Sequence, residues 1–205
     1  VEEISLKLAT ELGFPESEFL KRAREGYMFP DTYLFPKDVT GEEAAQIFLA
    51  NFQKKSSRID QTSLSSRGIN MEKLVIIASL IEREAKLAAD RPLTASVILN
   101  RLKIGMKLDI DATVQYALGY QTQEKSWWKK DLTNLDLEID SPFNTYQNPG
   151  LPPAPIANPG LAAMEAVVNA PDTNYLYYIS DKSGKLHLAG TIEEHNANID
   201  QYLNK

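Results

Sequence analysis

The stretch MEKLVIIASLIEREAKLAAD, residues 71–90, decides the fold around it. At about 100° per residue, a group of its apolar side chains falls into one stripe. This stripe is made of Leu74, Ile77, Ala78, Ile81, Ala85 and Ala88. Val75, Ile76 and Leu80 lie outside the stripe, so the first two turns are apolar almost all round. Because such a helix is buried rather than lying on the surface, the pattern predicts a buried helix over about residues 71–88.

Two glutamates, Glu82 and Glu84, stand where the apolar half of this helix ends. They are two positions apart, which places them about 200° apart around the axis, so they cannot act together in one small site. Glu82 lies over the small residues Ala78 and Ser79, which leave room for a ligand to approach, whereas Glu84 lies over bulky aliphatic side chains. From spacing alone, a surface ion pair between Glu82 and Lys86 is the more ordinary explanation.

Capping signals mark the beginnings of several further helices. They are Thr40 with Glu43, Thr191 with Glu194, Asp90, and Asn158 followed by Pro159. The first two pairs are capping boxes, and the others are a single cap and a cap with proline at the first helical position. The helices expected from these signals cover about 41–55, 91–104 and 159–170, and a last one follows Thr191. Asp111 and Gly119 bracket a shorter helix, and two more are expected at 2–12 and 16–25.

The remaining segments predict little regular structure apart from one hairpin. YLYYIS at 175–180 and KLHLAG at 185–190 are joined by DKSG and predict a β-hairpin. Two prolines in the aromatic segment 26–36 favour extended structure or a loop, and the Ser-rich segment 56–70 predicts a surface connection. No alternation of strands and helices supports a doubly wound sheet. The expected fold class is therefore α+β, a helix-rich domain with a small β-hairpin.

The composition of the 205 residues excludes several classes of function. The net charge of −6 gives no electrostatic reason to expect a nucleic acid as partner. The sequence has no cysteine, and His187 and His195 have no metal-binding spacing, so neither a disulfide nor a metal site is expected. It has no glycine-rich phosphate-binding loop. No apolar run approaches the roughly 18 residues of a membrane span.

A further candidate binding segment is NTY at 144–146, which offers an amide, a hydroxyl and an aromatic ring in succession. The Pro-rich run NPGLPPAPIANPG at 148–160 follows almost at once and limits the freedom of the loop. Its rigidity could hold these polar groups ready for a ligand. A structural turn in which Asn144 caps backbone groups explains the same pattern, so both explanations stay open.

Taken together, these segments resemble one family, the MltG-type (YceG-like) endolytic murein transglycosylases. The resemblance runs over nearly the whole chain from about residue 25. The segments that carry it are EGYMFPDTY at 25–33, ASLIEREA at 78–85, ASVILNRLKIGMKLDIDATVQYALG at 95–119, SPFNTY at 141–146 and GLPPAPIANPG at 150–160, with YLYYISD and EEHNANIDQYL near the C-terminus. The resemblance implies that residues 25–205 are a lytic transglycosylase domain and that residues 1–24 are the C-terminal remnant of a LysM-like subdomain.

The resemblance also implies a reaction that needs a single carboxyl group, the first glutamate of the ASxxExE motif, here Glu82. Glu82 would protonate the oxygen between N-acetylmuramic acid and N-acetylglucosamine, then take the proton of the muramyl C6 hydroxyl as a 1,6-anhydro ring closes. No metal or organic cofactor is expected. Asn144, Thr145 and Tyr146 are expected to orient the sugar or stabilise the developing charge. Asn100, Arg101, Asp111 and Thr113 are expected to line the cleft, although an ion pair of Arg101 with Asp111 is an open alternative.

The implied partners are peptidoglycan glycan strands and peptidoglycan synthases. The implied location is the outer face of the bacterial cytoplasmic membrane, reached through an N-terminal anchor absent from this fragment. One alternative is a non-catalytic peptidoglycan-binding scaffold module of the cell-wall machinery. A second is a lysozyme-like hydrolase, which requires another carboxylate near Glu82, with Asp109 and Asp111 as candidates. A folate-pathway lyase would need a pyridoxal-phosphate lysine, which nothing in the sequence marks.

Overall fold

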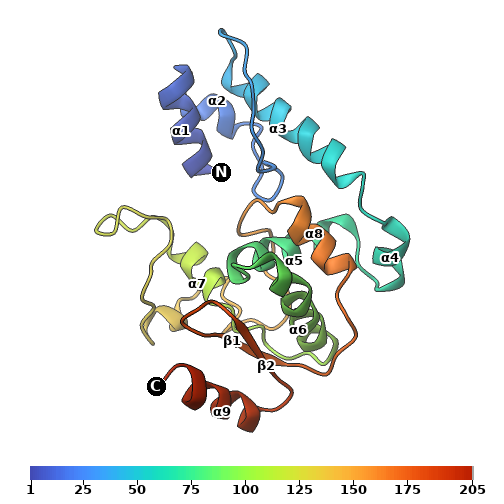
Figure 1. The fold of residues 1–205 in the computed structure, drawn as a ribbon. Coiled ribbons are helices and arrows are strands. Elements are labelled where there is room, and N and C mark those ends of the chain that lie inside the picture. Colours follow the sequence, from blue (N-terminus) through green and yellow to red (C-terminus); the bar gives the residue numbers. More distant parts are fainter. Residues whose placement is uncertain (205) are drawn as a thin grey trace.

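The computed structural model describes residues 1–204 and has the expected α+β composition (Figure 1). Its α-helices are α1 (Glu2–Leu12), α2 (Glu16–Leu20), α3 (Gly41–Ser56), α4 (Gln61–Ser66), α5 (Met71–Glu84), α6 (Arg91–Lys103), α7 (Asp111–Leu118), α8 (Leu161–Val168) and α9 (Ile192–Tyr202). Short 3₁₀ turns lie at Ala88–Asp90 and Asp136–Glu138. The strands β1 (Tyr177–Ser180) and β2 (Leu186–Ala189) form an antiparallel hairpin, which confirms the expected hairpin.

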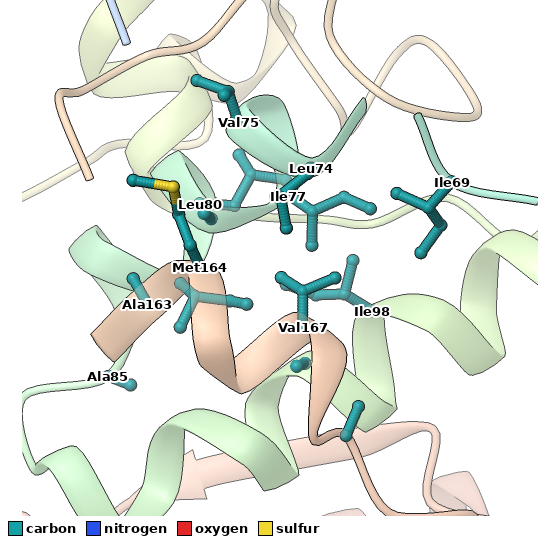
Figure 2. Close-up of a cluster of buried hydrophobic side chains, with 14 of the residues drawn as sticks. Ile69, Leu74, Val75, Ile77, Leu80, Ala85, Ile98, Ala163, Met164 and Val167 are labelled. Atoms are coloured by element: carbon teal, nitrogen blue, oxygen red, sulfur yellow. The ribbon is translucent and has the colours of Figure 1, made fainter. Parts of the chain in front are cut away.

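Helix α5 is the centre of the main core. Every residue from Leu74 to Ile81 is buried, which confirms that the apolar middle of this helix is buried on all sides, while Glu72, Lys73 and Arg83 are exposed. Helices α6 and α8 pack against it, and Figure 2 shows Ile98 and Met164 among the side chains gathered between the three helices. Each large aliphatic side chain buried here stabilises the fold by roughly 1.5–3 kcal/mol relative to an exposed one. The helix is therefore the scaffold from which its last turn presents polar groups.

Helix α5 ends at Glu84, earlier than the expected residue 88. Ala85 has an extended backbone with φ −97° and ψ 99°, and residues 86–89 are exposed. Because these residues make no core contact, packing does not hold them in the helical stripe that the sequence pattern suggested. The chain instead turns through a 3₁₀ segment and enters α6.

A second, smaller core joins α1, α2 and α3 to the aromatic segment after residue 26. Phe19 and Met28 are buried in it, and the rings of Tyr33 and Phe48 lie 4.0 Å apart between centroids. The aromatic segment forms no regular strand or helix, as its prolines indicated. Residues 1–24 are part of this smaller core, and their assignment to a LysM-like subdomain stays a prediction.

The C-terminal hairpin and α9 form one packed unit. Tyr177 pairs with Ala189 in the antiparallel register, and α9 packs against both strands. The ring of His187 stacks on that of Tyr202 at 3.6 Å between centroids. Both expected capping boxes, at the beginnings of α3 and α9, are present. Within residues 1–204, no helix combines the length and the apolar character that a membrane crossing requires.

Three local expectations are wrong. Asp90 makes no capping hydrogen bond, because it ends a 3₁₀ turn with a helical backbone and not the extended backbone of a cap. Asn158 does not cap α8, which begins at Leu161 after Gly160, because its side chain has distant partners. The segment 56–70 is not a plain connection, since Asp60 caps the short helix α4.

Candidate active site

Glu82 lies in the last turn of α5, and both of its carboxylate oxygens are held. Oε1 accepts a hydrogen bond from Arg91 Nη2 at 2.9 Å, and Oε2 accepts one from the backbone N–H of Gly160 at 3.0 Å. Arg91 is the first residue of α6, and Gly160 immediately precedes α8. Three helix ends therefore converge on one carboxyl group. Its cationic partner is Arg91, so the ordinary alternative from spacing, a surface pair with Lys86, is wrong.

The space expected above Ala78 and Ser79 is not open to a ligand. Both residues are fully buried, and the Ser79 hydroxyl accepts a hydrogen bond from the backbone N–H of Ile156 at 3.1 Å. The small side chains instead let the Pro-rich loop approach α5 closely. Glu82 itself remains reachable, with 27% of its side chain exposed.

Glu82 opens into a cleft of about 470 Å³, which is large enough for a small-molecule or glycan ring. The cleft lies between α1, the end of α5, α7 and the two loops that hold the tryptophans and Asn158. Its lining is Val1, Glu2, Glu3, Ile4, Glu25, Glu82, Arg83, Tyr116, Trp127, Trp128, Ala157 and Asn158. The expectations from sequence missed Glu25 and the aromatic residues of this cleft, because these residues are far apart along the chain.

Asn158 joins the Pro-rich loop to the segment that follows α2. Its Oδ1 accepts hydrogen bonds from the backbone N–H groups of Gly26 at 2.8 Å and Met28 at 2.9 Å, and its Nδ2 donates to Glu25 Oε1 at 2.6 Å. Gly26 has φ +90°, and a Cβ there would lie 2.5 Å from Pro155. The clamp therefore requires glycine, and it fixes the loop from which Gly160 reaches Glu82.

Arg91 has an unusual environment for a guanidinium. Nη2 bonds Glu82, but Nε is buried and has no hydrogen-bond partner within the described residues. A buried N–H without a protein partner costs roughly 1–3 kcal/mol unless a water molecule accepts its hydrogen bond. Among the described residues, Arg91 thus contacts Glu82 through Nη2 alone.

Asn144, Thr145 and Thr113 are buried, at 0%, 1% and 0% exposure. Asn144 donates to the carbonyl oxygens of Leu137 and Ile139, both at 2.9 Å. The Thr145 hydroxyl accepts from the backbone N–H of Ile110 at 3.0 Å and lies 3.0 Å from the Thr113 hydroxyl. These side chains hold loops together, and none belongs to the described lining of the Glu82 cleft. A role in substrate binding stays a prediction for them.

Asn100 and Arg101 lie on α6, where they hold the segment that leads into β1. Asn100 Nδ2 donates to the carbonyl oxygens of Thr173 and Tyr175, both at 2.9 Å. Arg101 Nε donates to the carbonyl oxygen of Leu176 at 2.6 Å. The carboxylate partner of Arg101 is Asp109, at 3.3 Å, and not Asp111.

Asp111 and Tyr146 belong to a second polar cluster, which also contains Glu84 and Tyr178. The Tyr146 hydroxyl donates to Asp111 Oδ1 at 2.6 Å, and the Tyr178 hydroxyl donates to Glu84 Oε2 at 2.7 Å. Burial raises the pKa of Glu84, and the negative charge of Asp111 raises it further. Within the described residues, Glu82 and Glu84 share no hydrogen-bond partner, as their spacing predicted. Asp109 and Asp111 are likewise outside the described lining of the Glu82 cleft.

No group of three or more histidine, aspartate and glutamate side chains within residues 1–204 is arranged to hold a metal ion. The chemistry that this geometry can perform is that of one partly exposed carboxyl group beside a guanidinium and a backbone N–H. Such a group can donate a proton to a bound ligand and take one back.

Comparison with known proteins gives a consistent result. The YceG-like family model matches residues 1–201. An endolytic murein transglycosylase of Bacillus subtilis is 39% identical over 186 residues, which are 90% of this chain and 49% of that protein. One of Streptococcus pneumoniae is 35% identical over 181 residues, 88% of this chain and 32% of that protein. The crystal structure of a YceG-like protein from Listeria monocytogenes has a TM-score of 0.76 and 34% identity, covering 95% of this chain and 63% of that one. The chain thus spans half or less of the length of these curated relatives.

Proposed function

The chain belongs to the YceG-like family, and on that premise we propose that it is the catalytic part of an endolytic peptidoglycan lytic transglycosylase with Glu82 as its single acid/base. The observation that carries this proposal is the position of Glu82. It is the carboxyl group of the family motif, it is partly exposed in a cleft, and Arg91 and Gly160 fix its orientation.

The proposed reaction breaks the bond between C1 of N-acetylmuramic acid and O4 of the following N-acetylglucosamine. Protonated Glu82 donates its proton to O4 as the C1–O4 bond breaks, and the bonding electron pair stays on O4. The muramyl C6 oxygen then bonds to C1, and its proton passes to the Glu82 carboxylate. The acid form is thereby restored, and no water is consumed.

Arg91 and Gly160 have complementary roles in this sequence. When Glu82 has lost its proton, the guanidinium of Arg91 and the N–H of Gly160 stabilise the carboxylate, each on a different oxygen. They also fix the direction in which the carboxyl group faces the cleft. Neither group needs to move between the two proton transfers.

The hydrolase alternative would require a second carboxylate, about 5–5.5 Å from the first for retention or 6.5–9.5 Å for inversion. Asp109 and Asp111, the candidates from the sequence, have Arg101 and Tyr146 as partners. Besides Glu82, the cleft is lined by Glu2 and Glu3 in the first turn of α1 and by Glu25. Glu25 accepts a short hydrogen bond from Asn158 on Oε1. A carboxylate engaged in this clamp is poorly placed to activate water.

The word murein in the names of the relatives supports peptidoglycan as the substrate. Contact with peptidoglycan synthases, and attachment to the outer face of the bacterial cytoplasmic membrane through an N-terminal anchor, follow from the family resemblance and form part of the proposal. The reaction needs no metal or organic cofactor.

The test is the nature of the new chain ends. Purified protein is incubated with uncrosslinked glycan strands, and the products are treated with borohydride and weighed by mass spectrometry. A lytic transglycosylase leaves 1,6-anhydro ends, which lack one water and resist reduction. Reducible ends that carry the added water would establish the hydrolase instead. Strands that are bound but left intact would favour the scaffold module.

A further inference from the structure

Both tryptophans of the chain, Trp127 and Trp128, line the cleft that contains Glu82. Each is partly exposed, as is their neighbour in the lining, Tyr116. Large aromatic side chains that stay partly exposed in a concave surface are typical of ligand sites. Nothing in the proton transfers at Glu82 uses these rings, so they require a separate explanation.

Each of these rings is held in place by another side chain. The Arg83 guanidinium covers the Trp128 ring at 3.5 Å from its centroid. Trp127 packs edge-to-face on Tyr120 at 5.4 Å. The ring of Tyr116 lies 4.9 Å from that of Phe143. Such support orders the three rings before a ligand arrives and lowers the entropy cost of binding.

The loop that carries the tryptophans is itself tied down. Gln121 and Ser126 form an antiparallel bridge, and the Ser126 hydroxyl accepts from the backbone N–H of Trp128 at 3.0 Å. Gln115 of α7 donates to the carbonyl oxygen of Lys129 at 2.7 Å. The tryptophan pair is therefore positioned from both sides by hydrogen bonds.

The charges around the rings select the class of ligand. The cleft lining carries the carboxylates of Glu2, Glu3, Glu25 and Glu82 next to the guanidinium of Arg83. An excess of carboxylates disfavours a polyanion such as a nucleic acid. A pyranose ring is neutral, has an apolar face of C–H groups and has hydroxyl groups at its rim. Its face can stack on indole rings while its rim donates hydrogen bonds to carboxylates.

We propose that Trp127 and Trp128 form a stacking platform for an N-acetylhexosamine ring of the glycan, next to the bond that Glu82 cleaves. The identity of the sugar rests on the proposed function, but the platform is independent of which residue performs the chemistry. Burial raises the pKa of Tyr116 to about 12, so its phenol stays protonated and can donate to the same sugar.

Intrinsic fluorescence tests this platform directly, because the chain has no tryptophan outside the cleft. The Glu82→Gln variant of the 205-residue protein, in which we expect no turnover, is titrated with uncrosslinked glycan strands. The tryptophan emission is expected to change in a saturable way. Trp127→Phe and Trp128→Phe should each remove part of that change while retaining most of the affinity. Trp128→Ala should weaken binding roughly tenfold.

Tyr175→Ala, an aromatic side chain 38% exposed outside the cleft, is the matched control and should leave Kd unchanged. Two results would overturn the platform. One is a titration in which the tryptophan emission does not change. The other is that Trp127→Ala and Trp128→Ala both bind the glycan with the same Kd as the parent, measured by calorimetry. Circular dichroism verifies the fold, and the phenylalanine variants keep the test decisive if an alanine variant unfolds.

The same variants separate this inference from the proposed function. With Glu82 intact, loss of a stacking ring should raise KM more than it lowers kcat. If cleavage requires Glu82 but is unchanged when either tryptophan is replaced, the platform is overturned and the proposed function stands. Glycan binding that needs the rings, in a protein whose Glu82→Gln variant still cleaves, would support the platform and overturn the assignment of Glu82.

Discussion

At the scale of single residues, Arg91 is the nearest partner whose loss should change the chemistry at Glu82. Arg91→Ala removes a charge-assisted hydrogen bond worth roughly 1.5–3 kcal/mol, so kcat/KM should fall about 10- to 100-fold. The measurement is the rate at which anhydro ends appear. Lys86→Ala is the matched control, because Lys86 is exposed and is not the partner of Glu82. Equal losses of kcat/KM in Arg91→Ala and Lys86→Ala would contradict the role given to Arg91.

Glu84 gives a prediction about pH. Burial, and then the charge of Asp111, raise its pKa above the ordinary value of 4.5. A carboxyl group with a raised pKa in the folded state contributes stability at low pH, and this contribution is lost as the pH rises through the raised pKa. Glu84→Gln keeps an acceptor for Tyr178 and removes the titration. The variant should therefore gain stability relative to the wild type as the pH rises above 4.5.

Urea unfolding of the wild type and Glu84→Gln over a series of pH values measures this difference. A difference in the free energy of unfolding that stays constant with pH would show that Glu84 does not titrate abnormally. Glu84→Gln should retain cleavage activity at a pH where it is folded, because Glu84 is not part of the lining of the Glu82 cleft.

At the scale of elements, Asn158 shows how two segments 132 residues apart form one side of the cleft. Asn158→Ala leaves the N–H groups of Gly26 and Met28 without their acceptor, which should cost about 2–3 kcal/mol of unfolding free energy. Activity should also fall in the folded variant, because the loop carries Gly160. Thermal unfolding and the rate of glycan cleavage are the measurements. Asn148→Ala, a residue of the same loop region that is itself exposed and makes no hydrogen bond to Gly26 or Met28, is the control.

The elements differ in how well the sequence predicts them. Thr40 with Glu43 and the hairpin turn use partners within a few residues, so the local pattern was sufficient. Asp90 and Asn158 carry the same local signals, but neither caps a helix. Asp90 has a helical backbone at the end of a 3₁₀ turn, and the Asn158 side chain bonds the distant Gly26 and Met28 instead. Helix α5 was predicted from its apolar period, whereas its end at Glu84 depends on packing that no local pattern contains.

The candidate site follows the same rule. Family resemblance singled out Glu82, because the motif around it is contiguous. Arg91 and Gly160 come from other helix ends, and the tryptophans come from a loop whose local sequence does not say which surface it faces. The polar residues of 144–146 were prominent in the sequence, yet two of them, Asn144 and Thr145, are buried in loop contacts. Contacts between distant segments therefore determine most of the site.

At the scale of the whole molecule, Gly26 lies where the smaller core meets the loop beside the main core. Gly26→Ala would place a Cβ 2.5 Å from Pro155 at φ +90°. The variant should lose roughly 2–4 kcal/mol of unfolding free energy, through both overpacking and backbone strain. Gly68→Ala is the matched control, since Gly68 has φ +67° but no atom within 4 Å of the added Cβ.

The Gly68 variant should therefore lose only the strain contribution, roughly 1 kcal/mol. For a chain of this size, each kcal/mol corresponds to about 2–4 °C in Tm. Calorimetry of the two variants measures both losses. Equal shifts in Tm would show that the Cβ added at Gly26 meets no steric resistance from Pro155.

The most direct measurement of the central claim compares wild type, Glu82→Gln and Glu84→Gln on the same uncrosslinked glycan strands, with the 1,6-anhydro ends counted by mass spectrometry. The two substitutions are chemically identical and lie in the same turn of α5, but only Glu82 opens into the cleft. We expect Glu82→Gln to abolish the anhydro ends, whereas Glu84→Gln, verified as folded, still produces them. Undiminished anhydro ends from Glu82→Gln would contradict the central claim.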